Sequence, residues 1–202
     1  LNNIKVGWDR KNGYIGTAVK SEDNVLVNEF DKLQCLERNG SYKIIPIPEK
    51  IFIGKLYDFR KYDPEQEFGV IYRENKSGKF YGKRCRIDKF ITERVYALCP
   101  DNCRVDLFTP RPDAMYEAIV ADKRRKEKLE FNVLTLAVRS AKARGLMLFG
   151  GKALEKLTWQ RYLEPDEVAA ALAAAGPRPA EEKDDENGEP TESAEGAAKV
   201  VP

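Results

Sequence analysis

Histidine is the side chain most often used for acid–base and metal chemistry near neutral pH, and this 202-residue sequence contains none. Its absence excludes Ser-His-Asp triads, Cys-His dyads and histidine-ligated metal sites. The sequence also lacks a paired-carboxylate motif and a phosphate-cradling glycine loop. A stand-alone enzyme is therefore the least favoured function class.

Four cysteines are the remaining residues with nucleophilic or metal-binding chemistry. Cys99 and Cys103 are close in sequence, whereas Cys35 and Cys85 lack paired spacing and two of the four fall in apolar strand patterns. Four cysteines are enough for one zinc site or two disulfides. The irregular spacing instead predicts buried or incidental thiols in a reducing compartment.

Lysine and arginine supply the positive charges of the chain, and they are unevenly distributed. The 35 basic and 33 acidic residues give a net charge of +2. Residues 164–202 hold 11 acidic and 3 basic side chains, a net charge of −8, which leaves +10 on residues 1–163. A basic body predicts a polyanionic partner, most commonly nucleic acid; the alternative is a well-solvated charged surface.

The elements that must position these cations are β-hairpins. Two apolar segments, residues 33–36 and 42–47, flank the turn Arg38-Asn39-Gly40-Ser41. Asn and Gly both tolerate the positive φ that a tight turn needs, so this pattern predicts a hairpin. Pro46 and Pro48 cannot donate to a neighbouring strand, so the second strand should end there or lie at an edge.

A second hairpin is predicted around Asn75-Lys76-Ser77-Gly78, with its return strand at residues 80–87. Alternation along the return strand places Lys83 on one face and Arg84 and Arg86 on the other. We therefore expect a half-buried strand that presents two arginines side by side to solvent or to a ligand.

Further short strands and weak helix signals complete the body. Residues 123–126 are all basic without an apolar stripe and predict a loop, and residues 134–140 fit either a helical turn or a strand. Many short strands separated by turns favour a sandwich, a barrel or a propeller-like array. The additional strands are expected at residues 104–108, 115–120, 145–149 and 154–159.

The acidic tail differs from the body. Residues 166–173 predict a short helix, and beyond Gly176 the chain has almost no large apolar side chain. Such a composition cannot bury enough surface to offset chain entropy, so we expect disorder there. We also expect the tail to compete with a polyanion for the basic body.

A faint internal repeat links two parts of the body. The pattern Val6-x3-Arg10-x2-Gly13 matches Val138-x3-Lys142-x2-Gly145. In each copy a basic turn closes at glycine and enters an apolar segment. Recurring blades would produce such a repeat.

Length and targeting signals give broader expectations. The chain begins at Leu1 and suits one domain plus a tail, so we expect a piece of a longer protein. No apolar run is long enough to cross a membrane and no signal peptide opens the chain, which predicts a cytoplasmic location.

Several motifs together resemble a known family. They are Val6-Gly7-Trp8-Asp9-Arg10-Lys11-Asn12-Gly13-Tyr14-Ile15-Gly16-Thr17, the turn at residues 38–43, residues 50–55, the long basic hairpin at residues 71–87, and residues 129–157. They resemble the C-terminal domain of bacterial topoisomerase IV A subunits, in the type IIA topoisomerase and gyrase A family, especially in Bacteroidetes. The family usually has a bulky apolar residue where Cys85 stands.

The resemblance implies an all-β fold, a β-pinwheel of four-stranded blades around whose basic rim double-stranded DNA bends. This chain would be a partial pinwheel, with a DNA-binding domain at residues 1–163, incomplete at its N-terminus, and a short possible helix and disordered acidic tail at residues 164–202. The fragment would be non-catalytic and carry no cofactor. The whole cytoplasmic, nucleoid-associated enzyme would use ATP and Mg²⁺ through its B subunit, and the A subunits would dimerise through the missing N-terminal part.

From the resemblance we also expect certain residues to bind DNA, all of them basic and in family-like turns or on basic strand faces. They are Arg10, Lys11, Lys79, Lys83, Arg84, Arg86, Lys89, Arg139, Lys142 and Arg144. The aromatic residues Trp8, Trp159, Tyr14, Tyr72 and Tyr81 are expected in core, blade-edge or cross-strand packing rather than on bases.

Two alternatives stay open. Gyrase A subunits carry a Gln-Arg-Arg-Gly-Gly-x-Gly box, which this sequence lacks. Its absence favours the topoisomerase IV type, which relaxes and decatenates DNA, over a gyrase. A propeller-like protein-interaction module is the other alternative, and it would need an apolar or aromatic surface patch.

Overall fold

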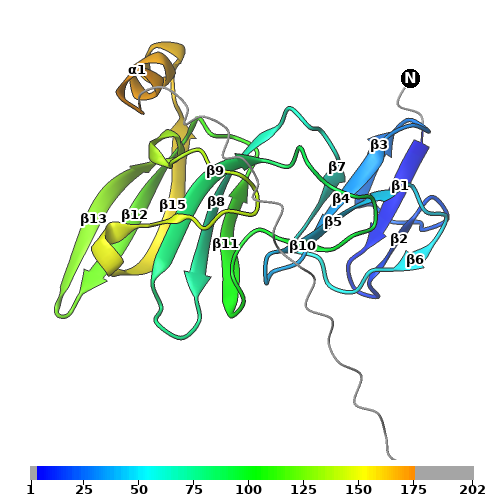
Figure 1. Ribbon diagram of the computed structural model, residues 1–202, viewed down its shortest axis with the longest axis horizontal. Coiled ribbons are helices and arrows are strands. Elements are labelled where there is room, and N and C mark those ends of the chain that lie inside the picture. The colour runs from blue at the N-terminus through cyan, green and yellow to red at the C-terminus, as the bar shows by residue number, and fades with distance from the viewer. Residues whose placement is uncertain (1–3, 176–202) are drawn as a thin grey trace, which may run out of the picture.

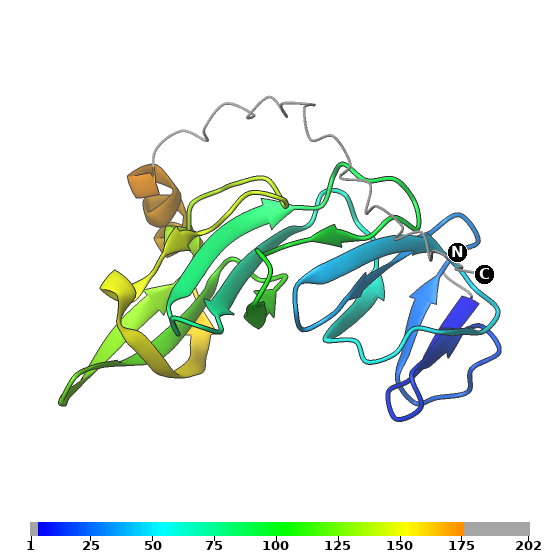
Figure 2. The same ribbon diagram turned by 60° about the horizontal axis from the view of Figure 1, so that its bottom comes forward.

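The computed structural model describes residues 4–175 as four antiparallel sheets and one α-helix, α1 (Pro165–Ala175), with two short 3-10 helices. Figure 1 shows the sheets in a row, from β1 at one end to β13 at the other, and Figure 2 shows the same row after a turn of the molecule. The prediction of an all-β, blade-like array is confirmed. We number the sheets as blades 1 to 4 along the chain.

Blades 1 and 2 each have four strands. Blade 1 has the order β3 (Asn24–Val27), β1 (Ile4–Asp9), β2 (Tyr14–Gly16) and β6 (Ile51–Phe52). Blade 2 has the order β7 (Asp58–Lys61), β4 (Lys32–Leu36), β5 (Ser41–Pro46) and β10 (Tyr96–Ala97).

Blades 3 and 4 follow the same plan, although blade 4 has three strands. Blade 3 has the order β11 (Cys103–Thr109), β8 (Glu67–Glu74), β9 (Phe80–Arg86) and β14 (Leu146–Met147). Blade 4 has the order β15 (Ala153–Tyr162), β12 (Ala114–Asp122) and β13 (Arg125–Asn132).

Strand exchange joins each blade to the next. Each blade is built on a hairpin, and the second strand of that hairpin pairs with a short strand supplied after the next hairpin. Thus β6 pairs with β2, β10 with β5, and β14 with β9. β13 is the second strand of the hairpin in blade 4, and within residues 4–175 it has no such partner.

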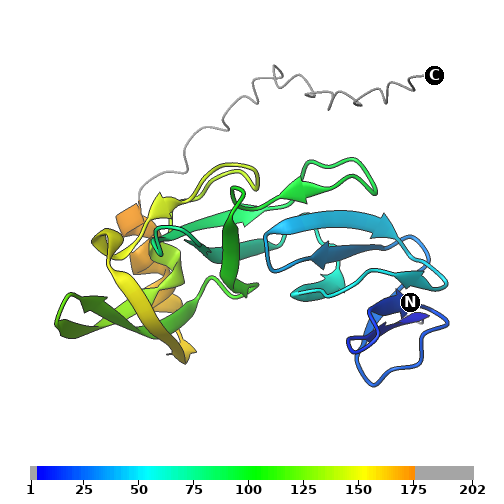
Figure 3. The ribbon, with the colours of Figure 1, turned by 90° about the horizontal axis from the view of Figure 1, so that it is seen from below.

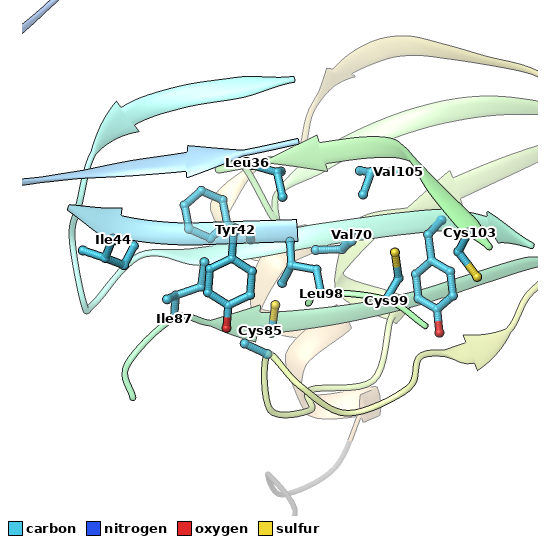
Figure 4. Packing of buried hydrophobic residues seen from close by; sticks show 13 residues of the cluster. Leu36, Tyr42, Ile44, Val70, Cys85, Ile87, Leu98, Cys99, Cys103 and Val105 are labelled. Atoms are coloured by element: carbon cyan, nitrogen blue, oxygen red, sulfur yellow. The ribbon is translucent and has the colours of Figure 1, made fainter. Parts of the chain in front are cut away.

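Three apolar clusters fill the spaces between successive blades. Blades 2 and 3 enclose the cluster shown in Figure 4, where Tyr42 and Leu98 meet Val70 and Cys85. Blades 1 and 2, and blades 3 and 4, enclose the other two. Both faces of β8 are therefore covered, which explains its nearly continuous apolar sequence rather than an alternating one.

The predicted hairpins are confirmed, and so are the strands at residues 104–108, 115–120 and 154–159. Pro46 is the last residue of β5, as expected. Residues 134–140 begin with the 3-10 helix η1 (Val133–Thr135), and residues 166–173 lie within α1. The predicted disorder beyond Gly176 lies outside the described residues.

Two local predictions were wrong in part. Residues 123–126 are not a basic loop throughout, because β13 begins at Arg125 and only Lys123 and Arg124 form the turn. The strand expected at residues 145–149 is confined to Leu146–Met147 and is followed by the 3-10 helix η2 (Phe149–Gly151). Pairing with β12 makes residues 125 and 126 part of a strand, whereas β14 pairs with only two residues of β9 and therefore stays short.

The faint internal repeat does not mark equivalent positions. Residues 10–13 form the turn between β1 and β2, and Gly13 there adopts a φ of 79°. Residues 138–145 instead connect blade 4 back to blade 3. The recurring units are the four hairpins, which share topology rather than this short pattern.

Cysteine burial is confirmed: all four cysteines are buried free thiols. Burial raises the pKa of Cys35 and of Cys99 to about 12. Thiols with such pKa values stay protonated and unreactive near neutral pH. No group of three or more His, Cys, Asp or Glu side chains gathers as metal ligands among residues 4–175. Within the same residues, α1 falls short of the length and apolarity that a membrane-crossing helix needs.

Candidate nucleic-acid interface

The connection from blade 4 back to blade 3 presents the basic residues that the structure brings together. We call residues 136–145 the strap. Its backbone follows β9, because the Arg84 N–H donates to the Ala137 carbonyl at 2.8 Å and the Arg139 N–H donates to the Arg84 carbonyl at 2.9 Å. At its other end, the Gly145 N–H donates to the Tyr72 hydroxyl at 2.8 Å. The strap is thus tied to blade 3 at both ends.

Lys83 fastens the strap from beneath. Its side chain is fully buried, and its ammonium group donates to the carbonyls of Ala141 and Ala143, both at 2.7 Å. Desolvation by burial lowers the pKa of Lys83. Lys83 therefore lies inside the protein, and the expectation that it offers its charge to DNA from a basic strand face was wrong.

Arg84 is a second internal anchor. It is 4% exposed, and its guanidinium donates to the Leu136 carbonyl at 3.0 Å and to the Glu67 carboxylate at 2.8 Å. The prediction that Arg84 faces solvent was wrong, because the face of β9 opposite Cys85 packs toward blade 4. Leu136 and Phe80 belong to the cluster between blades 3 and 4. Sequence alternation identified two faces but not that both are covered.

The strap carries its own cations outward. Lys142 and Arg144 are exposed, and Arg139 is half-buried. The Lys142 ammonium lies 4.9 Å from the centre of the Tyr96 ring, and the Arg94 guanidinium lies 5.9 Å from the same ring. We call Arg94, Arg139, Lys142 and Arg144 the strap cluster. Sequence reasoning missed Arg94, since only the folded chain places it beside Tyr96 and Lys142.

The other predicted residues on blade 3 do not form a line with the strap cluster. Lys79 is exposed at the start of β9, while Arg86 and Lys89 lie at and beyond its other end. Arg86 is 37% exposed and lies 3.9 Å from the Glu65 carboxylate. The buried Lys83 and Arg84 separate the two ends, so β9 itself presents no continuous row of cations.

Arg10 and Lys11 lie far along the row, in the turn between β1 and β2 of blade 1. The Arg10 guanidinium lies 3.7 Å from the centre of the Trp8 ring and donates to the Asp23 carboxylate at 2.8 Å. Hydrogen bonds from Asn12 lower the pKa of Asp9, which keeps this turn-forming carboxylate ionised. The turn thus presents Arg10 in a fixed position, with Lys11 exposed beside it.

A second basic cluster, missed by sequence reasoning, lies at the junction of blades 2 and 3. Arg38, Arg73 and Arg104 approach the Asp106 carboxylate at 3.3, 3.6 and 3.8 Å. Three guanidinium groups around one carboxylate leave an excess positive charge. We call these four residues the junction cluster. No sequence spacing could reveal it, because Arg38 lies in blade 2 whereas Arg73 and Arg104 lie on two different strands of blade 3, β8 and β11.

The aromatic predictions hold, with one refinement. Trp8 is 7% exposed and packs edge-on against Phe59, and Tyr72 stacks on Tyr81 across the β8–β9 hairpin. Trp159 packs against Tyr162 on the edge strand β15 but remains half-exposed. Figure 3 shows β15 at the blade 4 end of the row, away from blade 1.

Comparison with known proteins identifies a family with a matching sequence. The family model described as topoisomerase C-terminal domain, Bacteroidota, matches residues 5–154. The chain belongs to this family of topoisomerase C-terminal domains. The matched part of the domain runs from β1 to the start of β15 and includes the strap and the junction cluster.

One curated relative points in the same direction. The A subunit of DNA topoisomerase 4 from Borreliella burgdorferi is 33% identical to the domain over 107 residues. The alignment covers 50% of this chain and 17% of that relative, so the domain spans a small share of the relative's length. No solved structure matches the domain.

Proposed function

We propose that the chain binds and bends double-stranded DNA as the C-terminal domain of a type IIA topoisomerase A subunit, of the topoisomerase IV type. The observation that carries the proposal is the strap cluster. Three of its four cations lie on the strap, whose backbone is tied to blade 3, and Arg94 lies beside them at Tyr96, in a domain of the topoisomerase family. Phosphate contacts supply affinity and register without reading sequence.

Bending sets a requirement that such an array can meet. Smooth bending of a short site costs on the order of 1–6 kcal/mol, which several phosphate contacts must offset. Cations contribute most when the fold fixes their spacing, since less side-chain and loop entropy is lost on binding. The turn in blade 1 supplies one such cation, and the junction cluster and the strap cluster supply others where blades 2 and 3 meet.

The remaining predicted residues would extend these contacts. Lys79, Arg86 and Lys89 lie at the two ends of β9 and offer charges on either side of the strap. The cations of these clusters would contact phosphates rather than base edges. Binding should therefore depend strongly on salt and weakly on sequence.

The function proposed for the whole enzyme follows from the family. We infer that this domain is non-catalytic and helps select the DNA segment for ATP-dependent relaxation and decatenation. Cleavage, ATP hydrolysis with Mg²⁺ and A-subunit dimerisation would belong to the B subunit or to the rest of the A subunit. The enzyme would act on the nucleoid in the cytoplasm.

The topoisomerase IV type is preferred to gyrase on two grounds. The sequence has no Gln-Arg-Arg-Gly-Gly-x-Gly box. The curated relative also carries the name of DNA topoisomerase 4. Relaxation without wrapping-dependent supercoiling by the whole enzyme would support the choice, and negative supercoiling would reverse it.

A protein-interaction role is the second candidate. Ile91 and Val95, in the connection between β9 and β10, are 60% and 62% exposed, and Phe52 at the edge of blade 1 is 68% exposed. Apolar side chains of this kind favour a protein partner over DNA. Binding through them would depend little on salt.

Fluorescence anisotropy with unrelated duplexes across a salt series tests the proposal. We expect affinity that falls steeply with salt and is the same for each sequence. Energy transfer between dyes at the duplex ends should rise on binding if the DNA bends. A folded chain that binds no duplex at low salt would refute the DNA role and bring the protein-interaction role to first place.

A further inference from the structure

The outer edge of β13 breaks the rule that joins the other blades. The second hairpin strands β2, β5 and β9 each pair with a strand of two residues supplied from the next repeat. Within residues 4–175 nothing pairs with β13 on the side away from β12. Unpaired backbone donors and acceptors along a strand edge are a template for another strand.

Hairpin geometry shows which backbone groups face this open edge. The turn between β12 and β13 has two residues, Lys123 and Arg124, and its flanking pair is Asp122 and Arg125. In a two-residue hairpin the flanking pair exchanges backbone hydrogen bonds, and the bonded pairs then alternate along the ladder. The even-numbered residues Lys126, Lys128 and Glu130 therefore turn their N–H and C=O groups outward.

The edge is also accessible. Residues 122–128 and 130 are exposed, and Leu129 is half-buried, so neighbouring elements leave most of the strand uncovered on both faces. Figure 2 shows the tip of the β12–β13 hairpin projecting away from the other blades. A second strand could approach without displacing any part of blade 3.

We propose that β13 pairs with β13 of a second copy of this chain, antiparallel and about a two-fold axis, to form one continuous sheet across two molecules. Outward-facing residues must meet outward-facing residues, so even-numbered positions face even-numbered positions. One register places Lys128 opposite its own copy and Lys126 opposite Glu130 twice, so it combines one pair of like charges with two pairs of opposite charges. Another places Lys126 opposite Lys128 twice and opposes like charges only among these residues. A third places Lys128 opposite Glu130 twice.

The third register is the one of the three that opposes no like charges, because it places Lys126 opposite Asn132. Both Lys128–Glu130 pairs join opposite charges directly across the strands, and Leu129 meets its symmetry mate on the axis. Directly opposed pairs of opposite charge stabilise antiparallel strands, and like charges destabilise them. Lysines on an edge strand normally disfavour pairing with other strands. Because Glu130 follows Lys128 on the same edge, this edge favours a copy of itself in the third register over other partners.

A charge swap tests the pairing. Sedimentation equilibrium of the 202-residue chain over a concentration series should show a monomer–dimer equilibrium. Lys128→Glu or Glu130→Lys alone should weaken the dimer by about 30-fold, because two attractive pairs become repulsive. The double variant K128E/E130K should dimerise like the wild type, and an equimolar mixture of the two single variants should form heterodimers.

Matched measurements keep the test decisive. Lys156→Glu makes the same charge change on β15, two strands away, and should leave the dimer unchanged. Circular dichroism verifies that each variant folds, and hydrogen exchange should show protection of the Lys128 and Glu130 amides that rises with concentration. The proposal is overturned by a monomer at all concentrations, by a dimer that ignores both single reversals, or by concentration-independent protection, which would mean that another segment fills the edge.

Discussion

Replacing Lys83 with methionine tests how the strap is held. Methionine keeps nearly the same length but removes the charge and the donors that serve the Ala141 and Ala143 carbonyls, each 2.7 Å from the ammonium nitrogen. Hydrogen bonds from a charged donor contribute about 1.5–3 kcal/mol each. The apolar side chain avoids the desolvation that lowers the pKa of Lys83, which offsets part of the loss. We expect the free energy of unfolding to fall by about 2–4 kcal/mol.

Urea denaturation followed by circular dichroism measures this change. Hydrogen exchange should also speed up at the Arg139 and Gly145 amides, which tie the strap to blade 3. Lys79→Met is the matched control: Lys79 is exposed at the start of the same strand, so its loss should cost less than about 0.5 kcal/mol. A Lys83→Met protein with wild-type stability and wild-type exchange would refute the anchoring role of Lys83.

Three further perturbations have expected outcomes. Gly145→Ala should lower the melting temperature, because the added Cβ would lie 2.8–3.0 Å from Gly82 backbone atoms that cannot yield; an unchanged melting temperature would show that the strap can move. Asp106→Asn should raise DNA affinity at low salt, since it removes the one carboxylate among three guanidinium groups, and unchanged anisotropy would separate the junction cluster from DNA. Alkaline pH should destabilise the fold, because burial raises the pKa of the Cys85 thiol to about 11 and that of the Cys35 thiol to about 12. The stability that these two protonated thiols contribute is complete below the ordinary thiol pKa of 9.0, and it is lost as the pH rises through the raised pKa values. Melting temperatures that stay constant from pH 8 to 11 would contradict this.

Local patterns predicted most of the blade framework. Asn39-Gly40 and Ser77-Gly78 marked hairpin turns because few residues other than glycine adopt the positive φ found at Gly40 and Gly78, 90° and 71°. The short strands and the all-β class followed from the same kind of signal. These features depend on residues adjacent in sequence, so one sequence is enough to infer them.

The candidate site depended on contacts that no local pattern contains. Lys83 and Arg84 were expected on basic strand faces, yet the strap that covers them begins more than 50 residues later in the chain. Arg94 joins Lys142 only through Tyr96, and the junction cluster joins residues of two blades. Which cations are buried and which are exposed is decided by the strap and by the contacts between blades 2 and 3.

The central claim is that the cations of the strap contact DNA phosphates, and one comparison tests it most directly. The triple variant Arg139→Gln, Lys142→Gln and Arg144→Gln should bind duplex more weakly than wild type, with a salt dependence shallower by about three phosphate contacts. The control triple of Lys5, Lys20 and Lys156 to glutamine removes the same charge from positions elsewhere in the chain. Equal loss of affinity and equal salt slopes in the two triples would contradict the account, since net charge alone would then explain binding.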